Sequence, residues 1–122
     1  MKKLLMCIAV IGLLAACDKD EDRLINPEAD FSSYSTCLEA EFTDFVDAEL
    51  TCDEGAYIRS YTYQNDTVFV LFPGICGADY QAEVINDECT SLGFLHGISG
   101  NDDINGERFS LNAVEIETIW AN

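Results

Sequence analysis

Positive charge is scarce in this chain. Only six of its 122 residues are Lys or Arg, against 23 Asp or Glu, and the formal net charge is −17. Nucleic-acid binding draws its affinity from Lys and Arg side chains that contact phosphates, so the composition argues against a nucleic-acid partner. Anionic lipid headgroups would repel the chain as well. Strong acidity instead favours solubility and cationic protein partners.

Histidine and long apolar runs are also scarce. A membrane-spanning helix needs about 20 apolar residues, and no segment after the N-terminal stretch approaches that length. The single histidine, His96, stands near Ser99, a pair that could serve nucleophilic catalysis. A triad is recognised by geometry, and nothing in the sequence identifies a third member, so loop hydrogen bonding explains His96 more simply. We therefore assign no catalytic residue.

The N-terminus carries an export pattern. Lys2 and Lys3 precede the apolar stretch 4–16, and two alanines stand directly before Cys17. This is signal-peptide architecture. It resembles bacterial lipoprotein signals, which implies removal of residues 1–16 and lipidation of Cys17. Two or three acyl chains anchor a protein stably where one binds only marginally, so we expect membrane association through the lipid alone. An ordinary secretory signal with an unrelated cysteine is the alternative.

An acidic segment, 18–22, follows Cys17 directly. It resembles the surface-export signal of Bacteroidota lipoproteins, which implies an outer membrane lipoprotein exposed at the cell surface. In proteobacteria an aspartate at this position would indicate retention at the inner membrane, so a periplasm-facing position is the alternative. A solvated tether would have the same composition. We predict an acidic flexible tether at residues 17–35 and one small globular domain at residues 36–122.

Four cysteines remain for the exported domain: Cys37, Cys52, Cys76 and Cys89. An even number in an oxidising compartment predicts two disulfides, each contributing about 2–4 kcal/mol to stability. A four-thiolate zinc site is less favoured, because the closely spaced cysteine pairs typical of such sites are missing. We therefore predict neither a metal nor another cofactor.

The pairing of these cysteines depends on a predicted amphipathic helix. Apolar residues recur near a 3.6 period over residues 38–50, after a cap at Ser35 or Thr36. A helix of that length separates its ends by about 20 Å, whereas a disulfide needs Cα atoms within about 7 Å. Cys37 and Cys52 would then each have to reach a later cysteine. An early end to the helix would make local pairing possible again.

Downstream of Gly55 the sequence predicts strands. Segments 56–64 and 67–72 are rich in Tyr, Ile, Val and Phe and flank the turn pair Asn65-Asp66, which predicts a hairpin with a loop that could be a residue or two longer. Segments 81–86 and 113–120 predict further strands. In the last, one face would carry Val114, Ile116, Thr118 and Trp120. We predict an α+β fold with one helix packed on a three- to five-stranded, mostly antiparallel, disulfide-stapled sheet.

Two other patterns suggest surface features. Tyr57, Tyr61 and Tyr63 share a strand face with Arg59 and predict either an aromatic recognition surface or cross-strand packing. Segment 101–107 resembles the start of a calcium loop, but Asn101 and Asn112 replace the acids expected at its first and twelfth positions. A turn explains that segment without an ion.

As a whole, residues 37–120 resemble small uncharacterised lipoproteins of Bacteroidota, related to a domain of unknown function. The residues that carry this resemblance include Tyr61 to Gln64, Val68 to Val70, Cys76 to Asp79, Cys89, Leu92 to Leu95, Ile104 to Glu107, Ile119 and Trp120. The resemblance implies no activity. We expect a non-enzymatic cell-envelope lipoprotein that binds a macromolecule or a glycan. The alternative is an inhibitor of a cationic lysozyme or protease, and a small hydrolase using His96 and Ser99 or a carboxylate pair is a third candidate.

Overall fold

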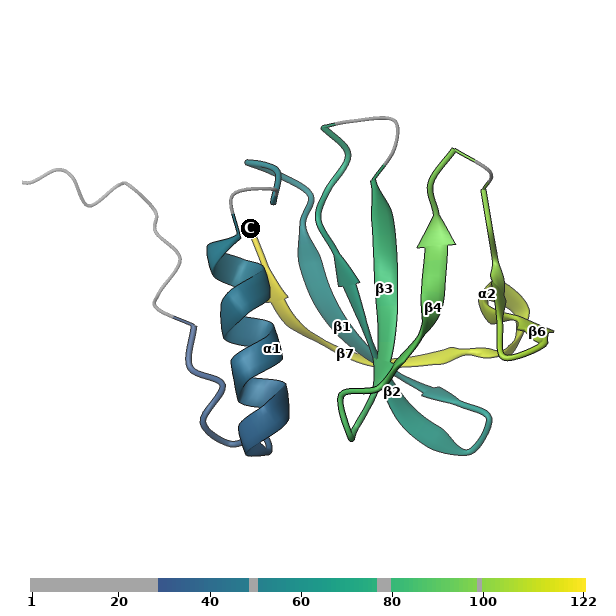
Figure 1. Ribbon diagram of the computed structural model, residues 1–122, viewed down its shortest axis with the longest axis horizontal. Helices are drawn as coiled ribbons and strands as arrows, with labels where there is room; N and C mark the ends of the chain where they lie inside the picture. Colours follow the sequence, from purple (N-terminus) through teal and green to yellow (C-terminus); the bar gives the residue numbers. More distant parts are fainter. Residues whose placement is uncertain (1–28, 49–50, 77–79, 99) are drawn as a thin grey trace, which may run out of the picture.

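The structure is a computed structural model that describes residues 29–48, 51–76, 80–98 and 100–122 (Figure 1). Cys17 and the predicted signal peptide lie outside these residues. In chain order the elements are α1 (Thr36–Asp47), β1 (Tyr57–Tyr63), β2 (Asp66–Phe72), β3 (Gln81–Asn86), β4 (Ser91–His96), β5 (Asp103–Ile104), β6 (Glu107–Arg108), α2 (Phe109–Asn112) and β7 (Val114–Ala121). None of the helices in the described part of the chain is long and apolar enough to cross a bilayer.

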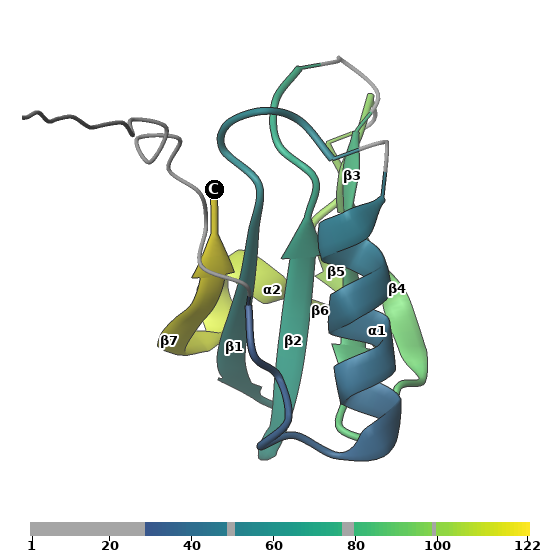
Figure 2. The same ribbon diagram turned by 90° about the vertical axis from the view of Figure 1, so that its left-hand side faces the viewer.

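Five strands form an antiparallel sheet in the order β4-β3-β2-β1-β7. The helix α1 covers one face, and the short β5–β6 hairpin and α2 lie on the other (Figures 1 and 2). The predicted α+β class is therefore confirmed. Strand β4 was not predicted, because its sequence carries Gly93 and little β-branched character. A side chain at Gly93 would meet Ile104, since an added Cβ would lie 3.0 Å from its Cδ1 atom.

Helix α1 begins as predicted and ends early. The Ser35 hydroxyl caps it by accepting a hydrogen bond from the Leu38 N–H (3.3 Å), and Leu38 and Phe42 are its buried residues. Ala48 is already extended, so the helix stops three residues before the predicted Leu50.

The two disulfides join Cys37 to Cys89 and Cys52 to Cys76, with Cα–Cα distances of 6.2 and 5.7 Å. Cys37 and Cys52 each reach a later cysteine, as expected from the helix, and the two bridges are nested in the sequence. One bridge ties the first turn of α1 to the β3–β4 turn, and the other ties the segment after α1 to the segment after β2. Both therefore join segments that are distant in sequence.

The core between α1 and the sheet, here called the helix-side core, also includes part of the predicted tether. Its buried members are Phe31, Leu38, Phe42, Ala56, Ile58, Phe69, Leu71, Ile85 and Trp120. Phe31 is only 5% exposed, and the Tyr34 ring contacts Phe42 edge-on at 5.2 Å. Figure 2 shows this segment running beside α1. Residues 29–35 therefore pack with the domain, because their aromatic side chains complete its core.

A second core covers the opposite face of the sheet. It contains Tyr63, Val68, Val70, Ala82, Val84, Leu95, Ile104 and Phe109. The Tyr63 hydroxyl donates hydrogen bonds to the carbonyl oxygens of Ile104 (2.5 Å) and Glu107 (3.1 Å). These bonds fasten the β5–β6 hairpin to the sheet. Burial on both faces explains why β2 is an almost continuous apolar run rather than an alternating one.

The β1–β2 turn has two residues, as in the predicted turn pair, but it lies one residue earlier. Gln64 and Asn65 both have positive φ (53° and 68°), and Tyr63 pairs directly with Asp66. Two successive left-handed residues are the requirement of a type I′ hairpin. The predicted Asn65-Asp66 turn was therefore wrong, and Asp66 instead begins β2.

Strand β7 also departs from its predicted pattern. Trp120 pairs with Ile58, whereas Thr118 pairs with the next β1 residue, Arg59, because the register shifts there, and it shifts again between Ser60 and Tyr61. Neighbouring residues on β1 point to opposite faces, so Thr118 and Trp120 do too. The predicted single-face stripe was wrong because these bulges break the alternation. Bulges also protect an edge strand from pairing with other chains.

Candidate functional site

A cavity of about 280 Å³ opens on the face of the sheet opposite α1, and we call it the sheet cavity. Its lining residues are Tyr57 and Tyr61 from β1, Val70 from β2, Leu95 and His96 from β4, and Asp102, Phe109, Ser110 and Ala113 from the segment that includes α2. The lining therefore combines aliphatic, aromatic and polar side chains. The wall that does not come from the strands of the sheet is formed by residues 102–113, between β4 and β7.

The aromatic wall is fixed by ring contacts. Phe109 packs edge-on against Tyr61 (5.2 Å) and is tilted against Tyr63 (4.9 Å). Of the three tyrosines predicted on this face, Tyr57 and Tyr61 line the cavity, while Tyr63 is 2% exposed and belongs to the second core. The predicted tyrosine face is thus divided: Tyr57 and Tyr61 line the cavity, and Tyr63 is packed in the core.

The polar group of the cavity is centred on Asp102. Its Oδ2 atom accepts hydrogen bonds from the Ser110 hydroxyl (2.5 Å) and from Arg108 Nε (3.4 Å), and Oδ1 accepts one from the Ser110 N–H (2.9 Å). The Ser110 hydroxyl, with further help from the Ser110 N–H and Arg108, holds the pKa of the Asp102 carboxyl below its ordinary value. Asp102 is therefore an ionised, immobilised acceptor. The sequence did not predict the role of Asp102, because its contact with Ser110 depends on how residues 102–113 fold.

This group predicts a pH-dependent contribution to stability. Because the pKa of Asp102 is lowered in the folded state, its contribution is present above its unfolded pKa of about 4 and is lost as pH falls through the folded pKa. We expect Asp102→Asn to lower the free energy of unfolding by about 1 kcal/mol at pH 7. Urea unfolding at several pH values should show this difference shrinking below pH ~4. A difference that is constant down to pH ~2 would contradict the assignment, and Asp44→Asn on α1 is the charge-matched control.

Arg59 stands between Tyr57 and Tyr61 on the same face of β1. Its guanidinium carbon lies 3.9 Å from the centre of the Tyr57 ring, and its Nε atom is buried without a hydrogen-bond partner. Burial raises the pKa of the Tyr57 hydroxyl, and Arg59 partly opposes that shift. The guanidinium is therefore positioned by stacking on an aromatic ring.

His96, the histidine of the hydrolase hypothesis, contacts an aromatic ring among the described residues. His96 ends β4, and its ring packs edge-on against Phe72 at 5.8 Å. Ser110 donates directly to Asp102, and no hydrogen bond between His96 and a serine or carboxylate occurs among the described residues. Ser99, the predicted partner of His96, lies outside them.

The segment that resembles a calcium loop forms the β5–β6 hairpin. Asp103 Oδ1 accepts a hydrogen bond from the Gly106 N–H (3.1 Å), and the Asn101 side-chain amide donates to the carbonyls of Phe94 and Asp103. Asn105 and Gly106 both have positive φ, as the tight turn requires. These side chains therefore have a structural role in the turn. Within the described ranges, no three His, Cys, Asp or Glu residues cluster as a metal site would require.

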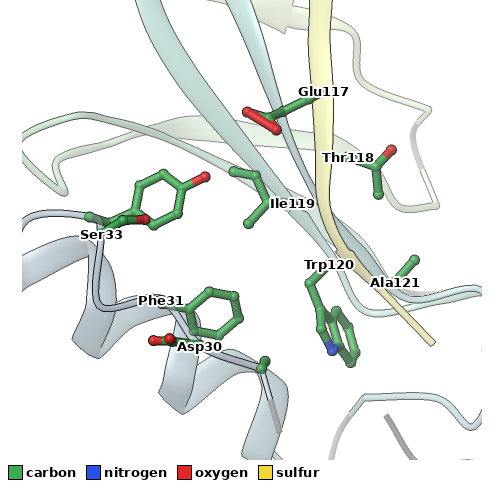
Figure 3. Close-up of a pocket in the computed structure, with 10 residues that line it drawn as sticks. Asp30, Phe31, Ser33, Glu117, Thr118, Ile119, Trp120 and Ala121 are labelled. Carbon is green, nitrogen blue, oxygen red and sulfur yellow. The ribbon is translucent and has the colours of Figure 1, made fainter. Parts of the chain in front are cut away.

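A second cavity, of about 540 Å³, lies between residues 29–34 and β7 (Figure 3). Phe31 and Trp120 from the helix-side core line it, together with Glu117. Burial, and next the nearby Glu117, raise the pKa of the Tyr34 hydroxyl. The Asp30 carboxylate accepts a hydrogen bond from the Ser32 N–H (3.0 Å). This cavity is larger, but its polar side chains are not joined into a fixed group as Asp102 and Ser110 are.

Comparison with known proteins distinguishes the two cavities further. A family model described as Domain of unknown function (DUF6970) matches residues 45–122. No curated protein and no solved structure matches the chain. The match includes every residue that lines the sheet cavity, whereas residues 29–34 of the second cavity fall outside it. Of these two cavities, the sheet cavity is therefore the one contained within the family domain, and its fixed polar group makes it the candidate site.

Proposed function

The chain belongs to the DUF6970 family of domains of unknown function, and from that premise we propose that it is a lipid-anchored, non-enzymatic binding module of the cell envelope. Its ligand in the sheet cavity is a glycan. Two independent parts of the chain support the proposal. The N-terminal pattern that ends at Cys17 supports the anchor, and the lining of the sheet cavity supports the ligand.

The observation that carries the glycan proposal is the combination of aromatic rings with a fixed carboxylate. A sugar ring has apolar C–H faces that can pack on aromatic side chains, and hydroxyl groups that need hydrogen-bond partners. Tyr57, Tyr61 and Phe109 offer the rings, and Asp102 with Ser110 offers oriented polar atoms. A volume of about 280 Å³ is near the lower end of small-molecule sites, roughly 300 Å³. The cavity suits a short piece of a glycan chain.

The binding test replaces one ring of the cavity wall. We expect Tyr61→Ala to weaken glycan binding about tenfold, since losing an aromatic contact of about 1.4 kcal/mol changes affinity by that factor. The measurement is calorimetry on residues 17–122 with Cys17→Ser, after screening a glycan panel. Phe94→Ala is the matched control, because Phe94 is exposed beside Phe45 on the α1 side of the sheet. Equal weakening by both variants, or no glycan bound, would contradict the proposal.

The anchor is tested separately by metabolic labelling. A clickable fatty-acid analogue should label the wild-type chain in its bacterial host, and Cys17→Ser should lose the label completely, because the thiol is the acceptor in the proposed reaction. Exposure at the outer surface is tested by protease accessibility on intact cells. Unchanged labelling of Cys17→Ser would refute the lipid anchor.

Capture of a cationic protein, such as a lysozyme or protease, is the second candidate function, and the outer face of α1 favours it. Glu41, Asp44 and Asp47 are exposed there, and α1 has no basic residue. Such a partner would be steered by charge, so its association would weaken steeply with salt. The same calorimetry at low and high salt separates the two functions, because contacts inside an aromatic cavity are much less sensitive to screening.

A further inference from the structure

The helix-side face of the sheet is not covered along its whole width. One row of paired residues crosses the five strands on this face, from Trp120 on β7 through Ile58, Leu71 and Glu83 to Phe94 on β4. Exposure rises along the row, since Ile58 is 0% exposed, Leu71 4% and Phe94 45%. The described residues therefore leave the β4 end of this face open.

An apolar groove of about 340 Å³ lies at this open end, and we call it the helix-end groove. Phe45 in the last turn of α1, Leu71 and Phe94 line it, and Tyr80 adds a third aromatic ring. Glu83, which stands between Leu71 and Phe94 in the row, is half-buried and belongs to the same lining. Within the described part of the chain, no Lys or Arg pairs with Glu83. The groove therefore combines apolar walls with one carboxylate that the described residues do not neutralise.

The charge around the helix-end groove is of one sign. Helix α1 has no basic residue, and its last turn carries the exposed Asp44 and Asp47. The C-terminal end of a helix also has a partial negative charge that favours cations, and Ala48, the residue at this end, lines the groove. The basic side chains of the described residues belong to the opposite side of the sheet: Arg59, Arg108 and His96. The charge complement of this groove is therefore a cation from outside the domain.

We propose that the helix-end groove docks an arginine side chain of a basic partner protein. In this complex the aliphatic stem of the arginine packs on Phe45 and Leu71, as long cationic side chains do on apolar surface. Its planar guanidinium stacks on the Phe94 ring and donates hydrogen bonds to the Glu83 carboxylate. Lysine fits less well, because its compact ammonium is strongly hydrated and lacks the planar fork.

The helix-end groove is a second site. It and the sheet cavity lie on opposite faces of the sheet, so the inference does not rest on the proposed glycan ligand. Charge on the outer face of α1 would steer any cation toward the domain. Phe94 and Glu83 together select a side chain that has both an aliphatic stem and a planar cation, and they give the capture of a cationic protein a specific point of contact.

The test is an NMR titration of ¹⁵N-labelled residues 17–122 with Cys17→Ser. The probe is a capped hexapeptide of alternating arginine and leucine. Its control carries citrulline, which is neutral and nearly the same shape, in place of each arginine. We expect the arginine peptide to shift the amide signals of Glu83 and Phe94 and to bind about tenfold more tightly than the citrulline peptide. A peptide of alternating lysine and leucine should bind more weakly than the arginine peptide.

Single variants locate the contact. Phe94→Ala and Glu83→Gln should each weaken binding of the arginine peptide about tenfold, because each removes a group that holds the guanidinium. Glu115→Gln makes the same charge change at an exposed position of β7 and should alter the affinity less than about twofold. Thermal unfolding of each variant, expected within a few degrees of wild type, verifies that the variants are folded.

Three results would overturn the inference. Equal affinity for the arginine and citrulline peptides would show that the groove does not recognise the cation. An equal effect of Glu83→Gln and Glu115→Gln would show that net charge, rather than the groove, attracts the peptide. Equal affinity for the arginine and lysine peptides would remove the planar cation as the ligand. Each of these results leaves the glycan test intact, because that test depends on Tyr61 and uses Phe94→Ala as its unaffected control.

Discussion

Replacing both Cys37 and Cys89 with alanine should lower the free energy of unfolding by about 4 kcal/mol. The bridge spans 52 positions in the sequence. Closing a loop of that length lowers the conformational entropy of the unfolded chain, which stabilises the folded state by about 4 kcal/mol at 25 °C. For a domain of this size each kcal/mol corresponds to about 4–8 °C in Tm. We therefore expect Tm to fall by about 15–30 °C, which is a large part of the stability of so small a domain.

The second disulfide supplies the comparison. It spans 24 positions, so the Cys52→Ala, Cys76→Ala double variant should lose about 3.4 kcal/mol by the same relation. Urea unfolding of both double variants under oxidising conditions measures the difference. Removal of a disulfide that contributes little to stability would lower the free energy of unfolding by less than about 1 kcal/mol. That result for the Cys37–Cys89 pair would contradict its stabilising role.

The Phe42→Ala variant should lower the free energy of unfolding by about 3–5 kcal/mol, which is the usual loss when a buried phenylalanine is truncated. Phe42 is 0% exposed. Its ring packs edge-on at 5.4 Å against both Phe31 and Phe69, and it also contacts Tyr34. One side chain therefore joins the N-terminal segment, α1 and the sheet, and no neighbour can fill the cavity without moving one of these layers.

Chemical unfolding monitored by circular dichroism measures this loss. Phe45→Ala is the control on the same helix, because Phe45 is only partly buried and contacts Trp120 at 6.3 Å. It should lose clearly less than Phe42→Ala. Equal losses for the two variants would mean that the contact among the three layers is not centred on Phe42.

The regular parts of this fold could be predicted from the sequence because their periodicity is local. Apolar residues recurring near a 3.6 period from Leu38 onward predicted the helix, and β-branched and aromatic residues predicted the β1–β2 hairpin. The expected helix also predicted that Cys37 and Cys52 would each pair with a later cysteine, without saying which one. The turn was misplaced by one residue and the β7 side chains were assigned to a single face, because left-handed residues and bulges are selected by pairing geometry that a single strand does not reveal.

The site was only half predictable for the same reason. Tyr57, Tyr61 and Arg59 share a face by simple alternation along β1, so the sequence identified them. Asp102, Phe109 and Ser110 belong to a segment of short elements. Their positions depend on long-range contacts, chiefly the Tyr63 hydroxyl bonds to the β5–β6 hairpin. No local pattern encodes such contacts.

The two disulfides leave one wall of the sheet cavity without a covalent tie. Both bridges join segments before residue 90, whereas the β5–β6 hairpin and α2 are held by the Tyr63 hydroxyl, the Asp102 group and the Phe109 ring. Segments held by few contacts open locally at a lower free energy than the global one. We therefore expect the β5–β6 hairpin and α2 to open locally without either disulfide being broken, and reduction of the disulfides to destabilise chiefly the segments that they join.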